Sequence, residues 1–374
     1  MDRKIATLSC LLLLCGTFAI GQSSKKKESG EGERDASSRI NVIAYYSGDR
    51  QRVNDYPVEK LSHIIFSFCH LSGNRLRVDN AEDTATIRNL VLLRKRNPSL
   101  KIMLSLGGWG GCETCSPVFS TDAGRKEFAS SVKEVNAWFH TDGIDLDWEY
   151  PAISGYPGHQ FLPADKQNFT ALVKALRDSL GTKNEISFAA GGFGKFLDES
   201  IEWDKVTPLV DRINLMSYDL VSGFSKSTGH HTPLFSTSQQ KESADNGVNK
   251  LIQLGVPPNK IVIGAAFYGR TWTGVEDVNN GLYQPGTFKS FVPYGKFVST
   301  INAENGFKFY YDSTARATHA YNKETKTFAT FDDAASLKEK TVYAGKRGLN
   351  GIMFWELTLD KPVDGLLDVI YKNR

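Results

Sequence analysis

The stretch DGIDLDWEYP, residues 142–151, alternates acidic with apolar side chains near the middle of the chain. In a β-strand, successive side chains point to opposite faces, so Asp145, Asp147 and Glu149 share one face. We call these three residues the acid row. Neighbours on one face lie about 6.6 Å apart, and carboxyl groups this close resist ionising together. A solvated charged run rarely alternates with Ile, Leu and Trp, so the pattern predicts a buried strand with a functional acid row.

Seven further segments on either side of this strand have the same apolar, β-branched character. They are INVIAYY (40–46), HIIFSF (63–68), KIMLSL (101–106), EISFAA (185–190), RINLMSY (212–218), KIVIGAAFY (260–268) and LNGIMFW (349–355). Helix-like segments, such as residues 124–140, 166–180 and 243–255, lie between them. Eight apolar strands that alternate with helices predict a parallel (β/α)₈ barrel, the TIM barrel of α/β proteins.

Residues 273–330 break this rhythm, because they are rich in Gly, Tyr, Phe, Thr and Asn. A connection of this length without structure is uncommon in a compact domain. We therefore predict a small α+β insertion between the seventh and eighth strands of a barrel that spans residues 40–374. The insertion leaves from the C-terminal end of a strand, which is the catalytic face of such barrels.

The first 39 residues differ in character from the predicted barrel. Arg3 and Lys4 precede an apolar stretch that ends before Gly21, so residues 1–21 predict a signal peptide cleaved near Gly21. Residues 22–39 combine mixed charge with Ser and Gly and predict a disordered linker. We expect a secreted protein, extracellular or periplasmic, without a stable membrane anchor. An uncleaved anchor is the alternative, because residues 25–27 are three lysines.

The formal net charge of +3 gives no support for binding nucleic acid or a polybasic membrane contact. We expect no cofactor and a monomeric protein. Cys112 and Cys115 form a CETC segment, which could be a redox pair, half a zinc site or a local disulfide. In the oxidising compartment of an exported protein we expect the disulfide. Cys69 is expected to be a buried thiol, and Trp138 and Trp148 are expected in the core.

The C-terminal ends of the predicted strands are the first place to look for chemistry. Besides the acid row, these ends carry Tyr45, Phe68, Ser105, Gly107, Gly108, Trp109, Met216, Tyr218, Asp219, Tyr268, Arg270, Trp355 and Glu356. No Ser-His-Asp arrangement, phosphate-binding glycine loop or metal-ligand cluster occurs among them. Aromatic rings stack on the flat apolar faces of pyranose sugars, and carboxyl groups with divided roles cleave glycosidic bonds. The strand ends therefore predict an enzyme that acts on a sugar polymer.

Several motifs resemble one known family. DGIDLDWEYP resembles the DxxDxDxE signature of glycoside hydrolase family 18, the chitinases and their relatives. Similar to other segments of that family are SLGGW (105–109), NLMSYDL (214–220), TGHHTPLF (228–235), AFYGR (266–270) and GIMFWEL (351–357). The insertion resembles that of the subgroup whose members bind chitin in deep clefts. The resemblance extends from residue 40 to the C-terminus and implies a chitinase that hydrolyses β-1,4-linked N-acetylglucosamine polymers.

The resemblance also implies a retaining mechanism in which the substrate assists. Glu149 would be the general acid, and the carbonyl oxygen of the substrate's N-acetyl group would attack the anomeric carbon. Asp147 would orient the acetamide, Asp145 would share a proton with Asp147, and Tyr218 would hydrogen-bond the acetamide. The residues implied to contact sugar are Tyr45, Phe68, Gly108, Trp109, Met216, Asp219, Tyr268, Arg270 and Trp355, with Trp355 as the floor.

Two residues near the acid row are expected to have structural roles. Asp142 lies off the alternating register and is expected to orient the strand from below. Ser105 is expected to be a hydroxyl that supports Asp145.

Three alternatives stay open. Another family 18 endo-N-acetylglucosaminidase, acting on N-glycan cores or peptidoglycan, fits the same motifs. A chitin-binding, lectin-like relative would typically lack the acid at the last motif position, which is Glu149 here. An unrelated barrel enzyme, such as a lyase, would leave the alternation of acids without a role. The sequence does not distinguish endo from exo cleavage.

Overall fold

The computed structural model describes residues 40–374. The predicted signal peptide (1–21) and linker (22–39) lie outside the described residues. The predicted domain boundaries, with an insertion at residues 273–330, stay predictions.

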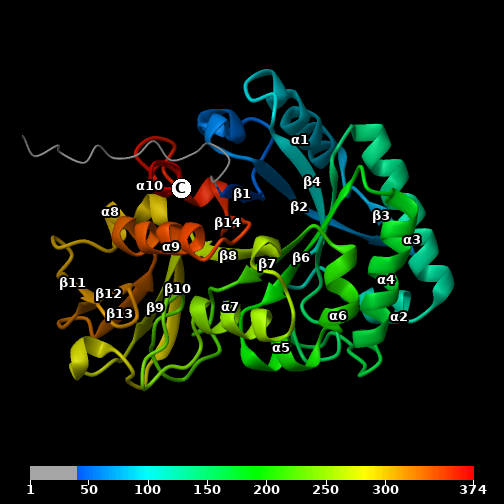
Figure 1. Ribbon diagram of the computed structural model, residues 1–374. Helices are drawn as coiled ribbons and strands as arrows, with labels where there is room; N and C mark the ends of the chain where they lie inside the picture. Colours follow the sequence, from blue (N-terminus) through cyan, green and yellow to red (C-terminus); the bar gives the residue numbers. More distant parts are fainter. Residues whose placement is uncertain (1–39) are drawn as a thin grey trace, which may run out of the picture. The chain divides into compact units, whose positions relative to one another are not determined.

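Eight parallel strands form a closed barrel (Figure 1). They are β1 (Asn41–Tyr46), β2 (His63–Ser72), β4 (Lys101–Gly107), β5 (Gly143–Asp147), β6 (Glu185–Gly191), β7 (Arg212–Met216), β8 (Ile261–Ala266) and β14 (Gly351–Trp355). The sheet runs in the order β1-β14-β8-β7-β6-β5-β4-β2, and pairing of β1 with β2 closes it. The short β3 (Arg75–Arg77) pairs antiparallel with the end of β2. The prediction of a (β/α)₈ barrel is confirmed.

Helices surround the barrel. They are α1 (Ala81–Leu92), α2 (Cys115–Phe119), α3 (Asp122–Phe139), α4 (Asp165–Leu180), α5 (Gly194–Glu199), α6 (Trp203–Val206), α7 (Ala244–Gln253), α9 (Ala334–Lys346) and α10 (Leu366–Asn373). Helix α3 begins after Thr121, whose hydroxyl accepts a hydrogen bond from the backbone N–H of Gly124 and so caps the helix. It ends at His140, which has the left-handed conformation that stops a helix.

A second, antiparallel sheet is inserted between β8 and β14. Its strands are β9 (Tyr268–Thr273), β10 (Thr287–Pro293), β11 (Phe307–Asp312), β12 (Ala317–Asn322) and β13 (Thr327–Phe331), in the order β10-β9-β13-β12-β11. The short helix α8 (Phe297–Thr300) lies between β10 and β11. In Figure 1 this sheet and helices α3 and α4 lie on opposite sides of the barrel. The segment KIVIGAAFY is not one strand, as the sequence predicts, because β8 ends at Ala266 and β9 begins at Tyr268.

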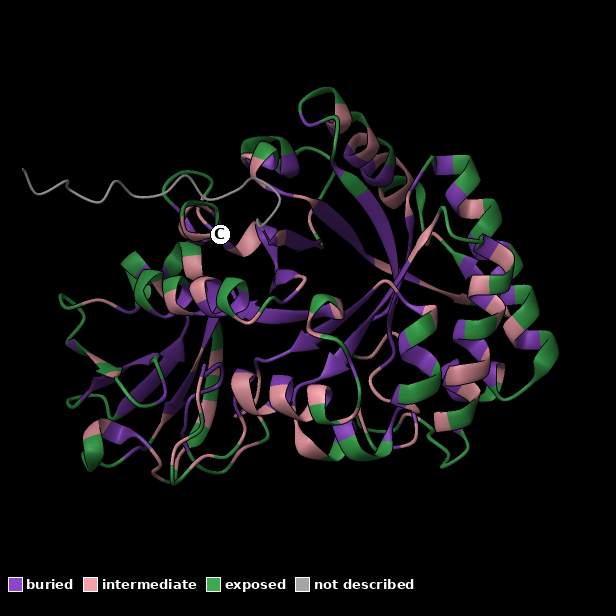
Figure 2. Cartoon of the chain, in the orientation of Figure 1, coloured by how far each residue is buried: buried purple, intermediate pink, exposed green. Residues whose placement is uncertain are grey.

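The buried residues follow the barrel walls. In Figure 2 the barrel strands are buried, whereas the outward faces of α3 and α4 are exposed. The expectation that Trp148 lies in the core is confirmed, since it is 4% exposed. The same expectation for Trp138 is wrong. Trp138 is 60% exposed on the outer face of α3, and the guanidinium of Arg88 lies 5.0 Å from the centre of its ring.

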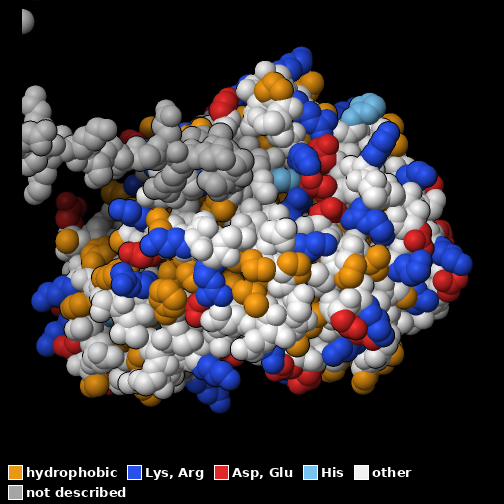
Figure 3. Space-filling view, in the orientation of Figure 1, with side chains coloured by type: hydrophobic (Ala, Val, Ile, Leu, Met, Phe, Trp, Pro, Cys, Tyr) orange, Lys and Arg blue, Asp and Glu red, His pale blue; other side chains and the backbone are white. Residues whose placement is uncertain are grey.

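No helix among residues 40–374 combines the length and the apolar character needed to cross a membrane. On the face shown in Figure 3, basic and acidic side chains are intermixed rather than separated into large patches of one sign.

A buried ion pair links the end of the inserted sheet to α9 and to the barrel. Lys340 Nζ lies 2.7 Å from Asp332 Oδ2, and neither side chain is exposed. Asp332 Oδ2 also accepts a hydrogen bond from the backbone N–H of Ala266, at the end of β8, at 3.0 Å. The hydroxyl of Thr232 lies 2.6 Å from Lys340 Nζ. The carboxylate thus depends on one cation for its charge balance.

We expect Lys340→Met to lower the free energy of unfolding by about 3–5 kcal/mol, because it leaves the buried charge of Asp332 without a partner. Urea unfolding followed by circular dichroism measures the change. The control is Lys174→Met, which removes an exposed helical ion pair with Asp178 and should change the free energy by less than about 1 kcal/mol. Equal losses in the two variants would contradict a special role for the buried pair.

Candidate active site

The acid row lies at the C-terminal end of β5, at the mouth of the barrel. Asp145 and Asp147 are buried, at 0% and 5% exposure, whereas Glu149 follows the end of the strand and is partly exposed. On the neighbouring strand β4, Ser105 is the register partner of Asp145 and Gly107 is that of Asp147. The alternation seen in the sequence therefore places carboxyl groups inside the barrel at successive heights.

Asp145 accepts hydrogen bonds from four side chains of four strands. Ser187 Oγ and Asn214 Nδ2 donate to Oδ1 at 2.6 and 3.0 Å. Ser105 Oγ and Tyr45 Oη donate to Oδ2 at 2.9 and 3.0 Å. Burial raises the pKa of Asp145, while the hydroxyl hydrogen bonds oppose that rise. Four donors around two oxygens favour the charged carboxylate.

The next two acids have a different environment. Asp147 Oδ1 is buried and has no hydrogen-bond partner among the described residues. Burial and then the charges of Glu149 and Asp145 raise the pKa of Asp147 well above its usual range. For Glu149, burial, opposed by a hydrogen bond with Tyr150 and supported by the charge of Asp219, raises the pKa to about 7. The acid row therefore retains a proton near neutral pH, as like charges at close range require.

Asp219 and Arg270 form a two-point ion pair beside the acid row. Arg270 Nε and Nη2 donate to the two oxygens of Asp219 at 2.5 and 2.6 Å. His231 Nδ1 lies 3.5 Å from Asp219 Oδ1. Burial by itself raises the pKa of Asp219, but the contacts with His231 and Arg270 outweigh it and hold the pKa below its usual range. Asp219 is thus a fixed negative charge near Glu149.

Aromatic rings surround the mouth of the barrel in two groups. Trp355 is partly exposed, and its ring stacks on Phe68 at 5.6 Å and tilts against Tyr45 at 5.9 Å. Trp109 is 48% exposed, with Tyr156 at 5.5 Å and Phe224 at 6.1 Å between ring centres. These rings offer flat apolar surfaces next to carboxyl groups, an arrangement suited to sugar rings.

Two further predicted contact residues lie deeper in the mouth. Tyr218 and Tyr268 are buried, and their ring centres are 6.3 Å apart. Met216 belongs to the same apolar cluster inside the barrel. Gly108 has a positive φ of 81°, and a Cβ there would lie 2.4 Å from the ring of Phe68. Only glycine therefore fits at position 108 without moving that ring.

Asp142 is separate from this assembly. Its Oδ2 accepts hydrogen bonds from the backbone N–H of Ile102 at 2.6 Å and from Arg94 Nη2 at 2.5 Å. These contacts hold the start of β5 against β4. A disulfide joins Cys112 and Cys115, with 5.1 Å between the Cα atoms, and Cys69 is free and buried.

Three residues that the sequence pattern did not predict contact two of the candidate acids: Ser187 and Asn214 contact Asp145, and His231 contacts Asp219. A signal for two of them was available, since Ser187 and Asn214 are polar residues at inward positions of otherwise apolar strands. His231 lies in the TGHHTPLF segment, but nothing in the local pattern shows which acid it meets.

Comparison with known proteins agrees with this geometry. The family described as glycosyl hydrolases family 18 matches residues 41–360, which is most of the chain. The chain belongs to glycosyl hydrolase family 18. A family 18 chain with these carboxyl groups in place is a glycoside hydrolase.

Individual relatives from bacteria and mammals share much of this family 18 chain. Chitinase A1 of Niallia circulans is 35% identical over 300 residues, which are 74% of this chain and 43% of that protein. Chitotriosidase-1 of Mus musculus is 31% identical over 322 residues, which are 80% of this chain and 67% of that protein. The chain thus matches less than half of chitinase A1.

A solved structure of a family 18 N-acetylglucosaminidase from Paenibacillus barengoltzii superposes with a TM-score of 0.82. It is 34% identical, and the match covers 90% of this chain and 100% of the other. The solved family 18 structure therefore has the same barrel fold that the strand pattern predicts for this chain.

Proposed function

We propose that the protein is a secreted chitinase that hydrolyses β-1,4-linked N-acetylglucosamine polymers by substrate-assisted, retaining catalysis. The observation that carries the proposal is the acid row. Glu149 has a pKa of about 7 at the barrel mouth, next to a buried Asp147 that has an oxygen without a partner. Two of the relatives are named chitinase A1 and chitotriosidase-1, which supports chitin as the polymer.

The proposed reaction begins with proton transfer from Glu149 to the glycosidic oxygen. As the bond between the anomeric carbon and that oxygen breaks, the acetamide oxygen of the same sugar bonds to the anomeric carbon and forms an oxazolinium ion. Asp147 orients the acetamide N–H and balances the positive charge, and the hydroxyl of Tyr218 donates to the acetamide. Asp145 shares a proton with Asp147.

The second half of the reaction restores the enzyme. The carboxylate of Glu149 takes a proton from water, and the water oxygen attacks the anomeric carbon. The bond to the acetamide oxygen breaks, and the product keeps the β configuration because two displacements occur at one carbon.

Sugar rings would stack on the two aromatic groups, with Trp355 as the floor and Trp109 at the rim. Tyr45, Phe68, Gly108 and Met216 would line this path. Tyr268, Arg270 and Asp219 would contact the sugars from the side of the inserted sheet, which we assign to the subgroup with deep substrate clefts. This assignment is supported by the position of Tyr268 and Arg270 on β9, the first strand of that sheet.

The proposal includes export. Residues 1–21 would be removed near Gly21, and the protein would act outside the cytoplasm as a monomer that is not anchored in a membrane. The mixed charge of the visible surface and the disulfide between Cys112 and Cys115 support this part of the proposal.

A time course on soluble chitin oligomers, with products separated by mass, tests the function. Accumulation of disaccharide alone indicates exo cleavage, and a mixture of lengths indicates endo cleavage. Release of monosaccharide alone favours an N-acetylglucosaminidase, the activity named for the Paenibacillus barengoltzii relative. Absence of any cleavage would overturn the chitinase and favour a lectin-like protein.

We expect kcat/KM to fall above about pH 7, because Glu149 must be protonated to act as an acid and its pKa is about 7. A carboxyl group with a raised pKa keeps its proton at any pH below that pKa and loses it above. The charge of Asp219 contributes to the rise, so Asp219→Asn should move the alkaline limb of the pH profile to lower pH. An unchanged limb in that variant would contradict this coupling.

A further inference from the structure

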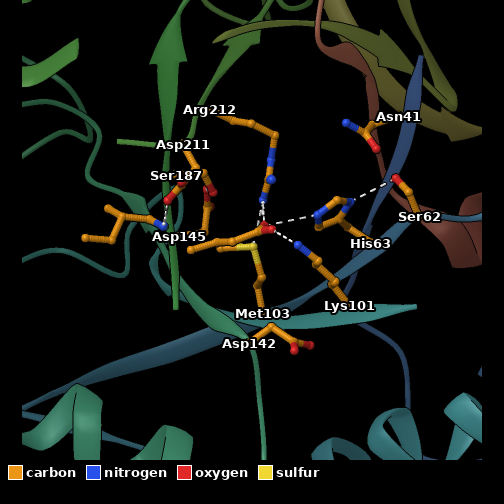
Figure 4. A network of polar contacts seen from close by, with 12 residues as sticks. Asn41, Ser62, His63, Lys101, Met103, Asp142, Asp145, Ser187, Asp211 and Arg212 are labelled. Carbon is orange, nitrogen blue, oxygen red and sulfur yellow. Dashed lines mark hydrogen bonds and ion pairs between the residues drawn. The ribbon is translucent and has the colours of Figure 1, made fainter. Parts of the chain in front are cut away.

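A cluster of ionisable side chains lies at the N-terminal end of the barrel, opposite the mouth. His63, Lys101, Glu185 and Arg212 are each the first residue of a barrel strand, and we call them the basal cluster. His63 Nε2 lies 3.1 Å and Arg212 Nη2 2.5 Å from Glu185 Oε2, and Lys101 pairs with the other oxygen. Figure 4 shows the three basic side chains converging on one carboxyl group.

The basal cluster carries one positive charge in excess near neutral pH. Burial lowers the pKa of His63 to about 4, so this ring is neutral. Burial alone would raise the pKa of Glu185, but the hydrogen bond with His63 and the charge of Arg212 hold it well below its usual range. Two cations then face one carboxylate. Lys101 is 47% exposed and screened by water, whereas Arg212 and Glu185 are 5% and 14% exposed, so the charges that act inside the barrel are those of this buried pair.

The basal cluster accepts only some of the hydrogen bonds that the guanidinium of Arg212 can donate. Its Nη2 lies 3.0 Å from Met103 Sδ, a weak acceptor, and its Nε is buried without a hydrogen-bond partner among residues 40–374. The guanidinium therefore keeps an unsatisfied donor inside the barrel, and its charge acts to lower the pKa of Asp145.

Asp145 lies on the mouth side of this charge. Arg212 and Asn214 are two residues apart on β7 and share its inward face, and Asn214 donates to Asp145 at 3.0 Å. Ser187, the register partner of Arg212 on β6, donates to the same oxygen at 2.6 Å. Arg212 thus occupies the layer of the barrel interior directly below Asp145.

The polar and titratable groups around Asp145 come from five strands and from Tyr218, which follows β7. They are Tyr45 of β1, Ser105 of β4, Asp147 of β5, Ser187 of β6, Asn214 and Arg212 of β7, and Tyr218. Within this set, Arg212 is the cation and Asp147 the other acid.

We propose that Arg212 is a positioning residue that determines which acid of the row holds the proton. Its charge keeps Asp145 as a carboxylate, so that the proton lies on Asp147, and this role rests on the proposed function. Asp145 and Asp147 then hold one proton and one negative charge between them. A second proton on Asp145 would leave this pair without a charge to balance the oxazolinium ion. Activity should therefore be lost when pH falls far enough to protonate Asp145, and Arg212 sets that pH.

The test is the acidic limb of kcat/KM against pH, measured on a soluble chitin oligomer. Arg212→Met removes the cation and should move the limb to higher pH by about one unit, the order expected for one charge in a low-dielectric interior. Glu185→Gln removes the opposing carboxylate and should move the limb to lower pH. Arg212→Lys keeps the charge and should restore the wild-type limb. Opposite shifts in the first two variants cannot arise from a general loss of packing.

Lys174→Met is the matched control, since it removes an exposed cation on α4, and its limb should coincide with that of the wild type. Circular dichroism verifies the fold of each variant, and Glu185→Gln remains decisive if Arg212→Met does not fold. Coincident limbs for wild type and Glu185→Gln, or shifts of the same sign in both variants, would overturn the role of Arg212. Inactivity of the wild type would instead refute the proposed function.

Discussion

Replacing Glu149 with glutamine should lower kcat by a factor of about 10² to 10⁴, the usual loss for a missing general acid. Glutamine keeps the shape of the side chain but has no proton to give to the glycosidic oxygen. Stacking on Trp355 and Trp109 does not depend on that proton, so the Kd for chitin oligomers should stay nearly unchanged. Steady-state kinetics and calorimetric titration measure the two quantities separately.

Glu127→Gln is the control for this variant, because Glu127 is an exposed acid on the outer side of α3. It should retain wild-type kcat. Turnover of Glu149→Gln at the wild-type rate would refute the assignment of Glu149, and a large loss of binding would show that the site had been distorted instead.

Fully deacetylated chitosan should not be cleaved, although its rings can stack on the same tryptophans. If the acetamide oxygen is the nucleophile, the sugar on the non-leaving side must carry an N-acetyl group, and cellulose should be resistant for the same reason. The first product from acetylated oligomers should have the β configuration, which proton magnetic resonance detects before the anomers equilibrate. A thiazoline analogue of the cyclic intermediate should inhibit strongly, since enzymes bind species close to the transition state more tightly than substrates.

Cleavage of chitosan at a rate near that of chitin would contradict this mechanism. An α-configured first product would do the same, and Asp147 would then have to act as an ordinary base on water. Chitosan with a known degree of acetylation serves as the internal control, because its cleavage should rise with the share of acetylated sugars.

The barrel could be predicted because seven of its strands carry mainly apolar runs and β5 alternates acidic with apolar residues, and both patterns are typical of strands with buried faces. The same local signal could not show where β8 ends. Phe267 is apolar, and only the pairing of Tyr268 with Pro293 on β10 shows that the chain has entered a second sheet. Trp138 was misplaced because a large apolar residue on a helix can also cover surface, as it does beside Arg88.

The acids of the site could be predicted because their alternation is visible in one short segment. Their partners could not, because the contacts cross the barrel. Asn214 is 69 positions away from Asp145, and Tyr45 is 100 positions away. Arg212 begins a strand in the sequence like any surface arginine. Only the closed barrel shows that its side chain points inward. This orientation places its charge below the acid row.

The distribution of the six tryptophans allows ligand binding to be followed by intrinsic fluorescence. Trp148, Trp203 and Trp272 are buried, at 4%, 5% and 0% exposure, so their fluorescence is insulated from a dissolved quencher such as acrylamide. Trp109 and Trp138 are the two with large exposed fractions. Trp138 lies on the outer face of α3, so replacing it with phenylalanine leaves Trp109 as the dominant quenchable emitter. When a chitin oligomer is titrated into this variant, the decrease in acrylamide quenching measures how much of the barrel rim is occupied. The measurement needs neither a label nor turnover.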